Sequence, residues 1–108
     1  MVERLRNVSV AVGTANVQMA EEIFGDALRT VLVVTNTSTA GQIITLSPDK
    51  DATVGEGIVL YPTGSWMESI DNKFTPTQKR IFAKASAAAG TLAVHERITS
   101  GEVPFRRG

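Results

Sequence analysis

The chain contains no cysteine and only one histidine among its 108 residues. Without thiols it can form neither a disulfide nor a thiolate zinc site, and it has no cysteine nucleophile. Acid–base and nucleophilic catalysis usually draw on histidine, cysteine or paired carboxylates at defined spacing, and no Gly-x-Ser-x-Gly elbow occurs in the sequence. We therefore expect a protein that is not an enzyme and that uses no cofactor and no metal.

An excess of charge of one sign is also missing. The 11 basic and 11 acidic side chains give a formal net charge of zero. Nucleic-acid binding takes much of its affinity from neutralised phosphates, so nucleic acid is not an expected partner. A net charge near zero lowers the electrostatic barrier to association between copies of one protein. This balance favours a protein that works in an assembly.

Long apolar runs are absent too. No stretch approaches the roughly 18 apolar residues that a membrane-spanning helix requires, so we expect no membrane partner. Residues 1–6 lack the apolar core of a secretion signal. These two observations predict synthesis in the cytoplasm.

Short β-like segments separated by turns make up most of the sequence. Val8, Val10 and Val12 alternate with smaller or polar residues, which is the period of two of a half-buried strand. Residues 29–36 are mostly apolar and β-branched, a pattern typical of a strand buried on both faces. Seven or eight such segments predict an all-β fold, either a single antiparallel β-sandwich or a jelly-roll-like barrel.

Further strands are expected at residues 14–20, where the segment could pair with the first strand, and at residues 42–46, 57–61 and 66–70. The last two strands, residues 80–87 and 91–98, flank Ala88-Ala89-Gly90 and predict a β-hairpin with a short glycine turn.

The acidic segment 20–28 is the only candidate helix. Gly25 interrupts it, so we expect a loop with one helical turn. No repeat or second domain is visible. Residues 1–98 are therefore predicted to form one β-sandwich domain, and residues 99–108 a C-terminal arm outside its core.

Arg29, Leu32, Asn36 and Ser38 follow the pattern R-x-x-L-x-x-x-N-x-S. This strand and turn, followed by the strand and Pro/Gly turn of residues 57–66 and by the closing strands of residues 80–94, resemble small virion proteins of tailed phages and related viruses. The resemblance extends over about residues 8–97.

The resemblance implies a viral structural protein with a compact β-sandwich. Such a protein is a self-associating, capsid-associated component of the virion (minor capsid, decoration, vertex or fibre base) and is made in the host cytoplasm. Its expected partners are further copies of itself, in a trimer or pentamer, and the major capsid protein or neighbouring virion proteins. The family provides no catalytic residues. The acidic segment 20–26 and the Phe/Arg tail depart from its pattern, which leaves the position on the particle open.

Four residues are candidates for a subunit interface: Trp66, Phe105, Arg106 and Arg107. Trp66 follows a Pro/Gly turn and is either a core residue or an interface anchor. Phe105 and the two arginines place an apolar ring beside two guanidinium groups, which suits docking onto a neighbouring subunit. A frayed terminus and contact with packaged genome are the alternatives for this tail.

The single histidine, His95, falls on a strand where it shares a face with Ala93 and Arg97. One histidine cannot form a metal cluster, so we interpret it as a surface or interface residue of the strand. Asp49 and Asp51 lack the spacing of a calcium loop and are interpreted as part of a solvated turn.

The alternative function is a receptor- or carbohydrate-binding module of a phage fibre or spike, because β-sandwiches often bind ligands through loops. It requires exposed aromatic side chains, and Tyr61, Trp66 and Phe74 are the ones available.

Overall fold

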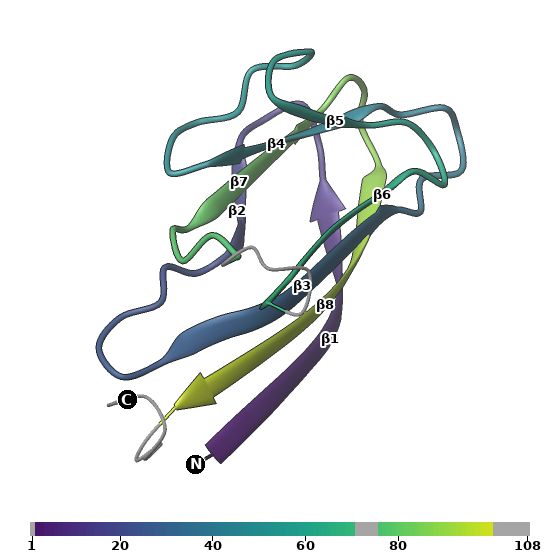
Figure 1. Cartoon of the computed structure of the whole chain (residues 1–108). Helices are drawn as coiled ribbons and strands as arrows, with labels where there is room; N and C mark the ends of the chain where they lie inside the picture. The colour runs from purple at the N-terminus through teal and green to yellow at the C-terminus, as the bar shows by residue number, and fades with distance from the viewer. Residues whose placement is uncertain (1, 71–75, 101–108) are drawn as a thin grey trace.

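Eight strands form two antiparallel four-stranded sheets in the computed structural model, which describes residues 2–70 and 76–100 (Figure 1). The long-strand sheet has the order β1 (Val2–Val12), β8 (Gly90–Ser100), β3 (Leu28–Asn36) and β6 (Ser65–Ser69). The short-strand sheet has the order β2 (Val17–Ala20), β7 (Ile81–Ala85), β4 (Ile44–Pro48) and β5 (Ile58–Leu60). The prediction of an all-β antiparallel sandwich with seven or eight strands is confirmed.

The strand pairing follows a simple rule. β1 pairs with β8, β2 with β7, β3 with β6 and β4 with β5, so the strand numbers of each pair add up to nine. The β3–β8 and β4–β7 pairs then join these four pairs into the two sheets. Eight strands wound in this order form a jelly roll.

The core lies between the inner faces of the two sheets, and alternate residues of each strand supply it. Leu32, Val34 and Leu92 of the long-strand sheet are fully buried, and so are Ile44 and Ile81 of the short-strand sheet. Complete burial of a side chain of this size contributes about 1.5–3 kcal/mol relative to an exposed position. The alternation predicted for β1 is present toward its end, because Val12 is buried and Val10 packs against the core, whereas Val8 is 37% exposed.

β7 and β8 do not form the predicted hairpin. β7 lies between β2 and β4, whereas β8 lies between β1 and β3 in the other sheet. The connection crosses from sheet to sheet through Ala89, whose φ is 68°, and Gly90. Alternate residues of both strands point into the core in such an arch, as they would in a hairpin. The alternation therefore could not distinguish the two arrangements.

Three further predictions, for residues 14–20, for β3 and for the acidic segment, compare with the structure as follows. The strand predicted within residues 14–20 is β2, but it pairs with β7 and not with β1. β3 is buried on one face only, since Val31, Val33 and Thr35 are half-buried. The segment 21–27 is a loop with one turn, in which Ala27 N donates to Phe24 O, and it contains no helix.

The boundary predicted at residue 98 falls inside β8, which continues to Ser100. Residues 101–108 of the predicted arm lie outside the described part of the chain.

Candidate functional site

The two sheets differ in length, and this difference creates an exposed inner surface. β1 and β8 have 11 residues each and β3 has nine, whereas the strands of the short-strand sheet have three to five. The ends of β1, β8 and β3 therefore extend past the short-strand sheet (Figure 1). On this overhang the inward positions carry Arg4, Arg6, Arg29 and Glu96 beside a single aliphatic residue of β8, Ile98.

Arg29 and Glu96 form a buried ion pair within the overhang. Their side chains are 0% and 3% exposed, and Arg29 Nε lies 2.6 Å from Glu96 Oε2. The other guanidinium nitrogens donate to the carbonyl oxygens of Thr77, Lys79 and Glu21. A buried charge is tolerated only when it is paired and its hydrogen bonds are satisfied. Arg29 thus ties the segments 21–27 and 76–80 to the sheet.

Gln78 holds the backbone at the same place. Arg29 N donates to Gln78 Oε1 at 2.7 Å, and Gln78 Nε2 donates to Arg29 O at 3.0 Å. The β3–β8 register shifts between Arg29 and Val31, and β3 pairs with β6 only from Val31 onward. The Gln78 side-chain amide therefore satisfies the backbone N–H and C=O of Arg29, which β6 does not reach.

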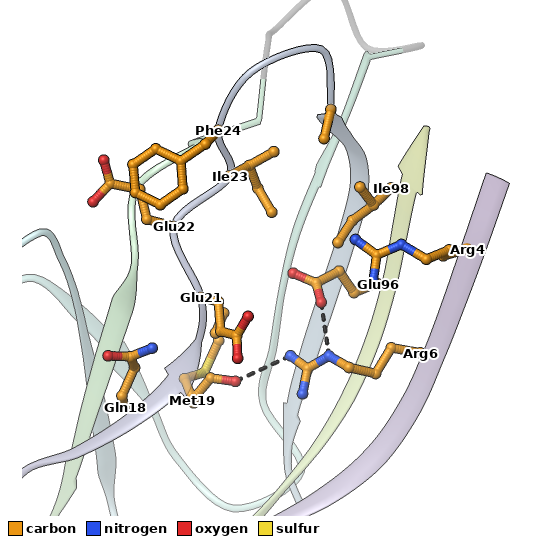
Figure 2. Close-up of a pocket in the computed structure, with 12 residues that line it drawn as sticks. Arg4, Arg6, Gln18, Met19, Glu21, Glu22, Ile23, Phe24, Glu96 and Ile98 are labelled. Atoms are coloured by element: carbon orange, nitrogen blue, oxygen red, sulfur yellow. Dashed lines mark hydrogen bonds and ion pairs between the residues drawn. The ribbon is translucent and has the colours of Figure 1, made fainter. Parts of the chain in front are cut away.

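An open groove lies beside this ion pair, between β1 and the segment 21–27 (Figure 2). Its volume is about 580 Å³. Arg6 forms one side, with Nε 2.7 Å from Glu96 Oε1 and Nη2 donating to Met19 O at 3.1 Å. Ile23 and Ile98 face one another across the groove, and the Glu21 carboxylate points into it.

The charged side chains of the groove are arranged by sign. Arg4 and Arg6 come from β1, whereas Glu21 and Glu22 come from the opposite segment. Glu22 has one distant partner, Lys79, at 3.9 Å. Within the described residues the Arg4 guanidinium and the Glu21 carboxylate have no ion-pair partner. The groove therefore has a basic wall and an acidic wall around an apolar floor.

The sequence reasoning missed this groove, although a signal for it was present. Arg4 and Arg6 occupy even-numbered positions of the first strand, in phase with Val8, Val10 and Val12. Charged residues at positions that should face a core indicate that the core ends there.

The outer face of the long-strand sheet is a second candidate surface. Its central rows are Asn7–His95–Val33–Met67 and Ser9–Ala93–Thr35–Ser65. The side chains of the second row are all small or hydroxylated, and Met67 of the first row is 55% exposed.

His95 lies half-buried on this outer face, on the same side of β8 as Ala93 and Arg97. Its Nδ1 lies 2.6 Å from Asn7 Oδ1, and Arg97 Nε donates to its Nε2 at 3.1 Å. Since Nε2 accepts, Nδ1 carries the proton and donates to Asn7. The structure places His95 where the surface-strand interpretation puts it.

Part of the outer face of the short-strand sheet, at β4, is covered by the chain itself, whereas Gln18 of β2 is exposed there. Residues 49–57 cross it, with Gly55 N donating to Thr45 Oγ1 at 3.0 Å and Ala52 N donating to Asn16 Oδ1 at 2.8 Å. Ala52 is buried as a result. No segment within residues 2–70 and 76–100 covers the outer face of the long-strand sheet in this way.

Of the four predicted interface residues, only Trp66 falls within the described structure. Trp66 is partly buried and packs against the edge of the core from β6. Phe105, Arg106 and Arg107 lie outside the described residues.

The aspartates considered for binding and Tyr61 lie in turns. Asp49 occupies a turn with φ of 70°, and Asp51 accepts a hydrogen bond from Asn16. The described part of the chain contains no group of three His, Cys, Asp or Glu side chains placed to hold a metal. Tyr61 is 63% exposed, whereas Phe74 lies outside the described residues.

In comparisons with known proteins, no protein-family model matches the chain and no curated protein matches its sequence. No helix within the described ranges is long and apolar enough to span a membrane. Across residues 2–70 and 76–100, the fold is a jelly-roll sandwich with one outer face covered at β4 and the other left bare.

Proposed function

We propose that this protein is a self-associating structural component of a virus particle, a capsid-associated protein of the minor capsid, decoration or vertex type. The observation that carries the proposal is the difference between the two outer faces of the sandwich. The chain's own segment 49–57 covers the β4 part of one face, and the described residues leave the other bare.

The chemistry of the bare face is that of a packing surface. Leu5 and Met67 are 56% and 55% exposed on it, at opposite edges of the sheet. The row next to that of Met67 contains Ser9, Ala93 and Thr35, which are short enough to allow close approach of another surface. Protein interfaces combine such apolar anchors with a polar, hydrogen-bonding surround.

The jelly-roll fold is compatible with a capsid protein but is shared with proteins of other functions. Jelly rolls are found in viral capsid proteins, in lectins and in cupins. A fold alone does not identify a function. Together with the sequence pattern that resembles small virion proteins, the jelly roll favours the capsid class.

A closed ring, such as a trimer or pentamer, suits the strand edges. β1 is an edge strand of 11 residues, and it pairs only with β8 within the described structure. Exposed edges invite uncontrolled pairing, and the charged Glu3, Arg4 and Arg6 are a usual protection against it. Symmetric closure places such edges against defined partners.

Light scattering on the purified protein, followed by a binding assay with the major capsid protein, tests the proposal. The expected result is a single oligomeric mass of several copies and saturable binding to assembled capsids. A strictly monomeric protein that also fails to bind capsid protein would refute it.

One observation favours the carbohydrate-binding alternative. Tyr61 is 63% exposed in the turn after β5, where a sugar ring could stack on it. A glycan array distinguishes the two functions: a signal that is lost in Tyr61→Ala would support a binding module, and an array without signal would leave the scaffold function favoured.

A further inference from the structure

The groove between β1 and the segment 21–27 is separate from the bare outer face, because its residues belong to the inner face of the overhang. The groove combines an apolar floor with a basic and an acidic wall, and the described residues leave several of its side chains without partners. These properties define what can bind there.

The apolar part of the groove matches one aromatic side chain. Ile23 and Ile98 face each other across it, and Met19 lies beneath them as a buried residue (Figure 2). Phe24 stands beside the groove with 72% of its surface exposed. A contiguous apolar site of this kind, bordered by charged groups, is typical of a docking pocket.

The charged walls match a ligand that carries both signs. The Glu21 carboxylate points into the groove without an ion-pair partner among the described residues, and Arg4 on the opposite wall is equally unpaired there. A bound segment therefore gains ion pairs by presenting a cation to the acidic wall and an anion to the basic wall.

The chain itself contains a segment with this chemistry. Residues 102–107 read Glu-Val-Pro-Phe-Arg-Arg. Phe105 supplies the apolar ring, Arg106 and Arg107 supply the cations, and Glu102 supplies the anion. On the basis of this match and of the proposed assembly, we infer that the groove receives residues 102–107 of a neighbouring copy.

The chain leaves β8 at the far end of the overhang, beyond Ile98, which lines the groove. β8 runs from Gly90 at the sandwich to Ser100 at the far end of the overhang, so it directs the chain away from its own core (Figure 1). Eight residues span at most about 26–29 Å. This length lets the segment extend beyond its own subunit.

Two charge reversals test the inference in the full-length protein. Glu21→Lys makes the groove basic, and Arg106→Glu makes the tail acidic. Each variant alone should associate about fivefold more weakly than the wild type in a sedimentation-velocity concentration series, because an exposed attraction becomes a repulsion. Glu56→Lys, the same reversal on the exposed segment 49–57, is the control and should associate as the wild type does.

The decisive measurement is a 1:1 mixture of the two variants. In the mixture the acidic tail of one protein meets the basic groove of the other, and the reverse pair is attractive as well. Association should therefore return to the wild-type strength. Circular dichroism of each variant confirms that folding is unchanged.

The possible failures are distinguishable. Variants that associate like the wild type, or a mixture that does not recover, would overturn the docking of the tail between copies and leave the assembly proposal standing. A tail that occupies its own groove would give the first result, since the reversed charges then lie within one copy and not between copies. A monomeric wild type also overturns the inference, and the proposed function fails only if that monomer does not bind capsid protein either.

Discussion

Arg29 Nε lies 2.6 Å from Glu96 Oε2, and both side chains are shielded from solvent. The second carboxylate oxygen of Glu96 pairs with Arg6 at 2.7 Å. One carboxylate thus holds two guanidinium groups, one buried and one at the edge of the groove. This cluster takes the place of an aliphatic core where the long strands extend past the short-strand sheet.

Removal of the shared carboxylate should strongly destabilise the domain. We expect Glu96→Ala to lower the free energy of unfolding by about 3–5 kcal/mol, because it leaves the Arg29 charge buried and unpaired. Arg6→Ala should cost less, roughly 1 kcal/mol, since the Arg6 side chain is 37% exposed and solvent screens its ion pair. Urea denaturation of both variants measures the difference. Equal effects of the two substitutions would contradict this account.

Asn36 closes the turn that follows β3 from a fully buried position. Its Nδ2 donates to the carbonyl oxygens of Gln42 and Leu60, both at 2.8 Å, and its Oδ1 accepts from Ser38 N at 2.9 Å. Asn36→Ala leaves these groups without a partner and should destabilise the protein by roughly 2–4 kcal/mol in urea denaturation.

Asn16→Ala is a matched control for Asn36. Asn16 also bonds to a backbone amide, Ala52 N, but it is only partly buried, so water can replace its hydrogen bonds. A loss of about 1 kcal/mol is expected. A larger loss for Asn16→Ala than for Asn36→Ala would show that burial does not determine the cost.

The sequence predicted the fold class because alternation reports which side of a strand is buried. Val10, Val12, Val34 and Val94 all follow that pattern and all lie on the inner face. The same alternation does not predict which strands pair with one another. β2 and β7 have the same alternation whether they adjoin their neighbours in sequence or cross to the other sheet.

The groove could be predicted only in part. Arg4 and Arg6 stand in phase with inward valines, and Glu96 stands in phase with Val94, which marks the end of the aliphatic core. The opposite wall comes from the segment 21–27, whose position depends on hydrogen bonds from Arg29 to backbone carbonyls. Every residue has a backbone carbonyl, so the residues that accept these hydrogen bonds cannot be recognised from the sequence.

Gly90, at the arch between β7 and β8, should tolerate no side chain. A Cβ at this position would lie 2.7 Å from Val12 O and 3.2 Å from Ala85 Cβ. Gly90→Ala should therefore lower the free energy of unfolding by about 1–3 kcal/mol, the cost of overpacking a close contact.

Gly13→Ala is the control for Gly90, because no atom lies within 4 Å of its Cβ position. Its effect should stay within about 0.5 kcal/mol. Thermal unfolding of the two variants compares them directly. A Gly90→Ala protein as stable as the wild type would show that the arch can shift to make room.

Met67 on the bare outer face should contribute to association without contributing to folding. It is 55% exposed and lies in one cross-strand row with Val33 and His95. Met67→Lys removes an apolar side chain from the proposed interface and adds a charge, so we expect association to weaken about tenfold or more, from the loss of part of the 1.5–3 kcal/mol that burial of such a side chain provides. Circular dichroism and the unfolding temperature should stay as in the wild type.

Val54→Lys is the matched control for Met67, because Val54 is 42% exposed on the segment that covers the other sheet. Sedimentation velocity over a concentration series should show wild-type association for Val54→Lys and weakened association for Met67→Lys. Equal association of the two variants would mean that the bare face of the long-strand sheet does not pack against another subunit, since an ammonium group buried there without a partner could not escape a cost in affinity.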